Sequence, residues 1–167
     1  EGTFLTGPVF LKSHMTLELQ RGATLLGRTD KAAYPVLPAT AEDLDGGKDI
    51  HFGGFEGLAR DMYAAPITAE YARDIRIIGP GRLDGNAQRG DWWQTFMKDP
   101  VARPRLMFLN RCEDVIVHGL DCMNAASWQL HPYYCKNIAF YGVSVSAPKD
   151  SPNTDALDPE SCDGVDI

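Results

Sequence analysis

Long apolar segments are missing from this chain, and their absence bears on where the protein can act. No apolar run approaches the roughly 18 residues that a membrane-spanning helix requires. The opening EGTFLTGPVFLKS has no basic start, apolar block or small-residue cleavage site, so it does not resemble a signal peptide. We therefore expect no interaction with a membrane, and we expect the chain to begin within a larger protein.

Positive charge is also scarce. Sixteen Lys and Arg residues face 23 Asp and Glu residues, giving a net charge of -7, and no basic cluster alternates with aromatic residues. Binding to a phosphate backbone requires such a cluster, so nucleic acid is not an expected partner. The composition is otherwise that of an ordinary globular protein, and 167 residues suffice for one domain.

Cysteine is sparse and irregularly spaced. The chain has four cysteines, which are Cys112, Cys122, Cys135 and Cys162. They include no CxxC pair and do not resemble the disulfide framework of a small secreted protein. The histidines lack metal-ligand spacing, so we expect neither a metal site nor a cofactor.

What the sequence does contain is a repeat. Each copy has polar residues, then an Asp or Asn in three of the four copies, an alternating run of β-branched and aromatic residues, and a glycine. The copies are ARDIRIIGPGRLDG, RCEDVIVHGLDCMNA, YCKNIAFYGVSVSAP and the start of a fourth, SCDGVDI. Equivalent positions, 40, 23 and 27 residues apart, are Asp74, Asp114, Asn137 and Gly164. Unit lengths of this kind predict a solenoid.

The pattern inside each copy indicates strands. Its period is two, and Pro and Gly interrupt every interval, so the predicted fold is an all-β parallel β-helix. Three cysteines precede the equivalent position by two residues, so Cys112, Cys135 and Cys162 should stack about 4.8 Å apart in neighbouring coils. Stacked parallel side chains do not provide the roughly 90° torsion of a disulfide, and we predict a row of free thiols.

Residues 31–66 interrupt the repeat. They lack a regular period and are rich in Gly, Pro and Asp. We predict that they form an irregular loop inserted into one β-helical domain that otherwise extends over residues 1–167. Long loops of this type commonly carry binding residues.

Five segments, in this order, resemble glycoside hydrolase family 28, the polygalacturonases and their relatives. They are FLTGPVFLKS, PITAEYARDIRIIGPGRLDGNAQRGDWW, RPRLMFLNRCEDVIVHGL, SWQLHPYYCKNIAFYGVSV and SPNTDALDPESC. The resemblance implies a right-handed parallel β-helix and inverting hydrolysis of α-linked galacturonic acid chains or oligosaccharides. It also implies a catalytic domain truncated at both ends, with the family's Gly-Asp-Asp, Gly-His-Gly and Arg-x-Lys motifs beyond residue 167. A solenoid whose last coil is open would be expected to associate through that end.

The family signature Asn-Thr-Asp-Gly is matched by Asn153, Thr154 and Asp155, with Ala156 in place of Gly. The resemblance makes Asp155 the catalytic carboxylate that activates or positions water, and Asn153 a ligand or orienting residue. Strand alternation would direct Ala156 into the coil, which is tolerable if its φ is not positive. Asp158 precedes a proline, and we expect a structural role for it in preference to a catalytic one.

Further contacts to the sugar are expected from neighbouring segments. His131 lies one coil before Asp155, close enough to line a subsite, although a structural histidine is the alternative. A polyanionic substrate needs local cations in a chain of this net charge, and Lys149 and Arg60 are the candidates. Trp92 could stack on a sugar ring, but packing against the solenoid is favoured.

Two other functions remain open. One is a β-helical polysaccharide lyase, which would need calcium and a basic proton acceptor; the other is an inactive carbohydrate-binding β-helix. The resemblance favours a secreted or periplasmic protein, because members of this family are usually exported. Unpaired cysteines are also compatible with a cytoplasmic oligosaccharide hydrolase.

Overall fold

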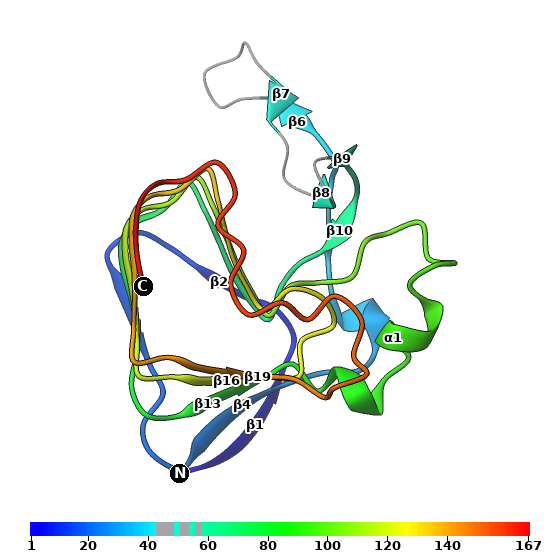
Figure 1. Cartoon of the computed structure of the whole chain (residues 1–167), viewed down its shortest axis with the longest axis horizontal. Coiled ribbons are helices and arrows are strands. Elements are labelled where there is room, and N and C mark those ends of the chain that lie inside the picture. Colours follow the sequence, from blue (N-terminus) through cyan, green and yellow to red (C-terminus); the bar gives the residue numbers. More distant parts are fainter. Residues whose placement is uncertain (43–48, 51–53, 56–57) are drawn as a thin grey trace.

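The computed structural model describes residues 1–42, 49–50, 54–55 and 58–167. The chain winds through three parallel sheets in turn, and each circuit adds one strand to each sheet. The coils therefore stack on one another as a right-handed parallel β-helix (Figure 1), which confirms the predicted fold. Among the described residues, no helix is long and apolar enough to cross a membrane.

Neighbouring strands are parallel in all three sheets. Sheet A contains β1 (Gly2–Thr6), β4 (Ala23–Gly27), β13 (Arg82–Asp84), β16 (Asp121–Met123) and β19 (Ser144–Ser146). Sheet B contains β2 (Val9–Leu11), β11 (Ile67–Glu70), β14 (Met107–Asn110) and β17 (Leu130–Tyr133), extended by bridges to Leu157 and Glu160. Sheet C contains β3 (Met15–Glu18), β12 (Arg73–Ile78), β15 (Glu113–His118), β18 (Lys136–Tyr141) and β20 (Asp163–Asp166).

The repeat seen in the sequence corresponds to one position in sheet C. The strand register aligns Asp74, Asp114, Asn137 and Gly164 in successive coils. Their φ angles are 54°, 55°, 54° and 72°, so each takes the left-handed conformation that Asn, Asp and Gly tolerate best. The predicted register is confirmed, and the backbone conformation explains why these residue types recur there.

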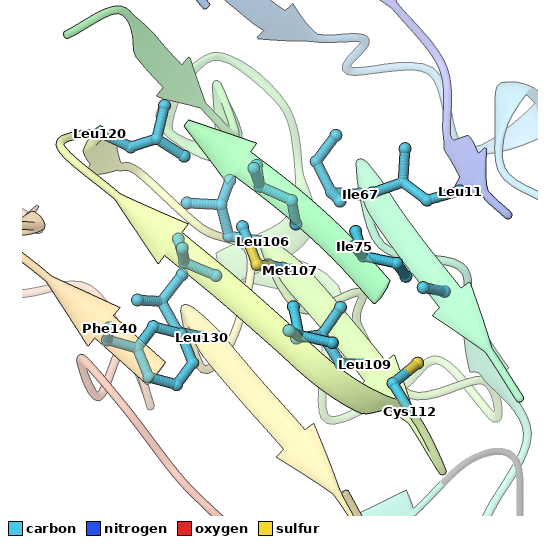
Figure 2. Close-up of a cluster of buried hydrophobic side chains, with 14 of the residues drawn as sticks. Leu11, Ile67, Ile75, Leu106, Met107, Leu109, Cys112, Leu120, Leu130 and Phe140 are labelled. Atoms are coloured by element: carbon cyan, nitrogen blue, oxygen red, sulfur yellow. The ribbon is translucent and has the colours of Figure 1, made fainter. Parts of the chain in front are cut away.

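Alternate residues of the strands fill the interior. In β12, β15 and β18 the buried positions are aligned in two rows, Ile75, Val115 and Ile138 in one and Ile77, Val117 and Phe140 in the other. Figure 2 shows Ile75, Phe140 and other apolar side chains of this core gathered between the sheets. Burying one aliphatic side chain contributes about 1.5–3 kcal/mol to folding. Because these side chains are buried against those of the adjacent coils, each coil is stabilised mainly by its neighbours.

Three cysteines form the interior row that the sequence predicts. The backbone N–H of Cys112 donates to Cys135 Sγ over 3.4 Å, and that of Cys135 donates to Cys162 Sγ over 3.4 Å. These three are free thiols, as predicted, and so is Cys122. Cys122 is buried separately in sheet A, where burial raises the pKa of its thiol to about 12.

Two excursions leave the solenoid on the same side (Figure 1). The first, between β4 and β11, contains the 3₁₀ helix η1 (Lys31–Ala33) and short antiparallel pairs. These pairs are β5 (Val36–Leu37) with β10 (Met62–Tyr63), β6 (Ala41–Glu42) with β7 (Asp49–Ile50), and β8 (Gly54–Phe55) with β9 (Leu58–Ala59). The second, between β13 and β14, contains η2 (Ala87–Arg89) and α1 (Trp92–Thr95).

Trp92 connects the two excursions by packing. Its side chain is 1% exposed and makes edge contacts with Tyr34 and Tyr63 at ring-centroid distances of 5.4 and 5.3 Å. A buried indole cannot form a platform for sugar rings, so the packing role favoured by the sequence is confirmed.

Candidate active site

The segment that contains Asp155 lies at the edge of sheet B. After β19 the chain turns and runs along β17, where Gln129 N–H donates to Asp155 O over 2.8 Å and Leu130 N–H donates to Ala156 O over 3.1 Å. The Asp155 side chain is exposed on this segment. Its backbone is thus fixed by the preceding coil while its carboxylate remains accessible to solvent.

Ala156 does not occupy the position expected for it. Residues 152–153 lie in a turn and Ala156 in a bend, with no regular strand between them, and Ala156 is exposed. The expectation that it points into the coil is therefore wrong, because strand alternation does not apply here. The φ angle of Ala156 is not positive, so its methyl group causes no left-handed backbone strain. The left-handed residue of this segment is Asn153, with φ 56°.

A buried arginine that sequence reasoning missed holds this turn. Arg103 is 5% exposed, and its Nη2 donates to Asn153 Oδ1 over 2.6 Å. Its Nη1 donates to Pro152 O over 3.0 Å and to Ala126 O over 2.7 Å. The guanidinium therefore ties the turn before Asp155 to the preceding coil, and the Asn153 side chain is one of its acceptors.

The outer face of sheet B beside Asp155 carries a row of aligned side chains, namely Phe108, His131 and Asp158. His131 is 3% exposed and lies among aromatic rings, including Trp128 at 5.0 Å and Phe108 at 5.3 Å between centroids. An imidazole so enclosed presents no accessible edge to a ligand here. Its burial favours the structural alternative, and its contact with substrate stays a prediction.

One hydrogen bond and the burial of the ring define the protonation of His131. Arg105 Nε donates to His131 Nδ1 over 3.3 Å, and His131 Nε2 lies 3.3 Å from Glu160 Oε2. Burial and the positive charge of Arg105 lower the pKa of His131 to about 3. The ring is therefore neutral, with its proton on Nε2, which lies near Glu160 but makes no hydrogen bond to any residue that the structure describes.

Asp158 differs from Asp155 in its surroundings. Burial, together with the charge of Asp155, raises the pKa of Asp158 to about 6, and Arg105 opposes that rise. Asp158 Oδ2 is buried and has no hydrogen-bond partner in the part of the chain that the structure describes. When two carboxyl groups on one short segment have different environments, one can be ionised and accept a proton while the other stays protonated. The sequence offered only the Asp-Pro step, which does not reveal this burial.

The structure brings some of the predicted site residues together. Asn153, Asp155 and Asp158 share one segment, and His131 lies beside it in β17. Lys149 is exposed on the turn that leads into this segment. Among the described residues, no group of three His, Cys, Asp or Glu side chains could hold a metal ion.

Comparison with known proteins places this geometry in a family. The family model described as "Glycosyl hydrolases family 28" matches residues 37–167. A probable polygalacturonase of Vitis vinifera is 36% identical over 99% of this chain and 32% of its own length. An endo-polygalacturonase of Pectobacterium carotovorum subsp. carotovorum is 23% identical over 98% of this chain and 40% of its own length.

Solved structures agree on the fold. The crystal structure of a hyperthermoactive exopolygalacturonase from Thermotoga maritima matches 97% of this chain and 41% of its own, with a TM-score of 0.75 and 25% identity. A polygalacturonase from Erwinia carotovora ssp. carotovora matches 98% of this chain and 43% of its own, with a TM-score of 0.75 and 21% identity. The chain thus spans about a third to two fifths of these relatives, and it belongs to glycosyl hydrolases family 28.

Proposed function

We propose that this chain supplies part of the catalytic domain of a hydrolase that cleaves α-linked galacturonic acid chains or oligosaccharides with inversion. The observation that carries the proposal is the exposed Asp155 carboxylate, on a motif shared with the family and on a turn fixed by Arg103. A polymeric substrate that cannot cross a membrane favours action outside the cytoplasm.

In this proposal Asp155 accepts a proton from the attacking water. Inverting hydrolysis requires a second carboxyl group roughly 6.5–9.5 Å away, which protonates the leaving oxygen. Resemblance to the family assigns that acid to the Gly-Asp-Asp motif of the next coil. Asp158, which holds its proton up to about pH 6, would donate a hydrogen bond to the water or to a sugar hydroxyl beside Asp155.

Other residues would hold the substrate or the site. Asn153 orients the Asp155 turn through Arg103, and Lys149 offers an accessible cation to a substrate carboxylate. The ring of His131 is buried, so His131 would affect substrate binding indirectly, by positioning Glu160 and the neighbouring side chains on the outer face of sheet B.

The test compares Asp155→Asn with Asp150→Asn in the full natural polypeptide. Asp150 is an exposed carboxylate on the turn that leads into the Asp155 segment, so it is a matched control for the local charge. Release of reducing ends from polygalacturonate should fall at least about 10²-fold for Asp155→Asn, because general base catalysis is lost, and stay unchanged for Asp150→Asn. Equal activity of both variants, or an unsaturated product absorbing in the ultraviolet, would contradict the proposal.

A further inference from the structure

A pocket of about 150 Å³ lies beside the Asp155 turn and is separate from the carboxylates. It is lined by Arg60, Phe96, Met97, Ala102, Arg103 and Ser127. Arg60 lies between β9 and β10 in the first excursion, Phe96 and Met97 follow α1 in the second, and Ser127 belongs to the coil before Asp155. A volume this far below the range of drug-sized ligand sites suits a single small ring.

Among the residues that the structure describes, the two arginines of this pocket have uncharged hydrogen-bond partners. Arg60 donates through Nε to Pro100 O over 3.1 Å and through Nη2 to Asp99 O over 2.6 Å, both of them neutral carbonyl oxygens. The acceptors of Arg103 are likewise uncharged, being two carbonyls and the Asn153 amide. Neither guanidinium forms an ion pair with a carboxylate within the described ranges of the chain.

The side chain of Asp99, whose backbone carbonyl accepts from Arg60, is engaged elsewhere. The carboxylate of Asp99 lies 3.1 Å from Lys31 Nζ and accepts the backbone N–H of Val101, so it does not neutralise Arg60. Burial lowers the pKa of Arg103 to about 10, which still leaves it charged near neutral pH. A buried charge without a counter-charge is costly, and an anionic ligand would offset that cost.

Apart from Ser127, the remaining wall is apolar. The Arg103 guanidinium stacks over the Phe96 ring at 4.1 Å, and Met97, which is 81% exposed, stands at the rim. A uronate presents both an apolar face of C–H groups and one carboxylate, which matches an aromatic wall beside two guanidinium groups. A neutral sugar would leave the paired positive charges unmatched.

We propose that Arg60 and Arg103 bind the carboxylate of a galacturonate residue that neighbours the sugar cleaved at Asp155, with Phe96 against its ring. The proposal rests on the proposed function and adds a subsite to it. It also accounts for how a chain of net charge -7 attracts a polyanion, because the attraction is local to this pocket.

The test uses Arg60→Gln in the full natural polypeptide, with Arg76→Gln as the control. Arg76 is exposed on β12 in sheet C, away from the pocket. Arg60 is chosen over Arg103 because Arg103 also holds the Asp155 turn. Loss of one charged hydrogen bond should raise KM for polygalacturonate about tenfold, with kcat nearly unchanged, whereas Arg76→Gln changes neither.

A second arm separates charge from structure. Binding of trigalacturonate and of its methyl ester is measured by calorimetry for the wild type and for both variants. Arg60→Gln should weaken the free acid about tenfold and the ester little, while Arg60→Lys restores part of the affinity. Equal weakening for acid and ester, or for Arg60→Gln and Arg76→Gln, would overturn the subsite.

The two proposals fail in different ways. If the wild type released no reducing ends, the proposed hydrolysis would be wrong, yet selective loss of trigalacturonate binding in Arg60→Gln would still support the subsite. If the wild type hydrolysed polygalacturonate but Arg60→Gln kept its KM and affinity, the subsite alone would be refuted.

Discussion

Substitutions of Asn153 test whether Arg103 holds the turn that carries Asp155. Asn153 contributes two separable features, a φ of 56° and an Oδ1 that accepts from Arg103 Nη2 over 2.6 Å. Asn153→Gly keeps the backbone conformation and loses the acceptor. Asn153→Ala loses both, whereas Asn153→Asp retains both, since Asp also tolerates a left-handed backbone.

The magnitudes follow from these contacts. A hydrogen bond to a charged group contributes about 1.5–3 kcal/mol, and the exposure of Asn153 favours the lower end, so Asn153→Gly should lose about 1.5 kcal/mol of unfolding free energy. A left-handed alanine should cost about 1 kcal/mol more. Because a displacement of about 1 Å can lower a rate 10²-fold, kcat on polygalacturonate should fall at least about tenfold for Asn153→Ala.

The assay combines urea unfolding with release of reducing ends, and Asn137→Ala is the control. Asn137 has φ 54° and an amide that donates to Asp114 Oδ1 over 3.1 Å, but it lies in sheet C. It should lose stability in the same way and keep kcat. The reasoning would be refuted if Asn153→Asp were as damaging as Asn153→Ala, or if Asn137→Ala lowered kcat as much.

Three further predictions concern the packing and charge of the fold. All four cysteines should react with iodoacetamide after denaturation without reductant, and a peptide containing a Cys112–Cys135 disulfide would contradict the interior row. The folded pKa of Asp158, about 6, lies above its usual value of 3.8, so stability should fall as pH rises from about 4 through 6. Asp158→Asn should remove that fall in the urea midpoint, and an unchanged slope would count against the burial of this carboxyl. Leu109→Ala should cost about 3 kcal/mol of unfolding free energy because Leu109 is fully buried between coils; a loss below about 1 kcal/mol would show that the interior is loosely packed.

The sequence alone determined the fold, and it singled out one candidate residue of the site. The left-handed position of each coil accepts few residue types, so Asp74, Asp114 and Asn137 mark the register without any tertiary information. Strand alternation likewise fixed which side chains face inward, and the common offset of the cysteines fixed their row. Asp155 could be singled out because its motif is local.

Tertiary structure decided what depends on groups distant in the chain. The hydrogen bond between Arg103 and Asn153 joins residues 50 positions apart, and the sequence around either residue does not indicate which residue it contacts. The raised pKa of Asp158 arises from burial against another coil, and the exposure of Ala156 arises from a bend where alternation was assumed. The Arg60 and Arg103 pocket forms only where two excursions meet the solenoid. The local sequence pattern specifies the backbone conformation and the side of the strand on which each side chain lies. Burial and charge pairing, in contrast, depend on which distant segments the fold brings into contact.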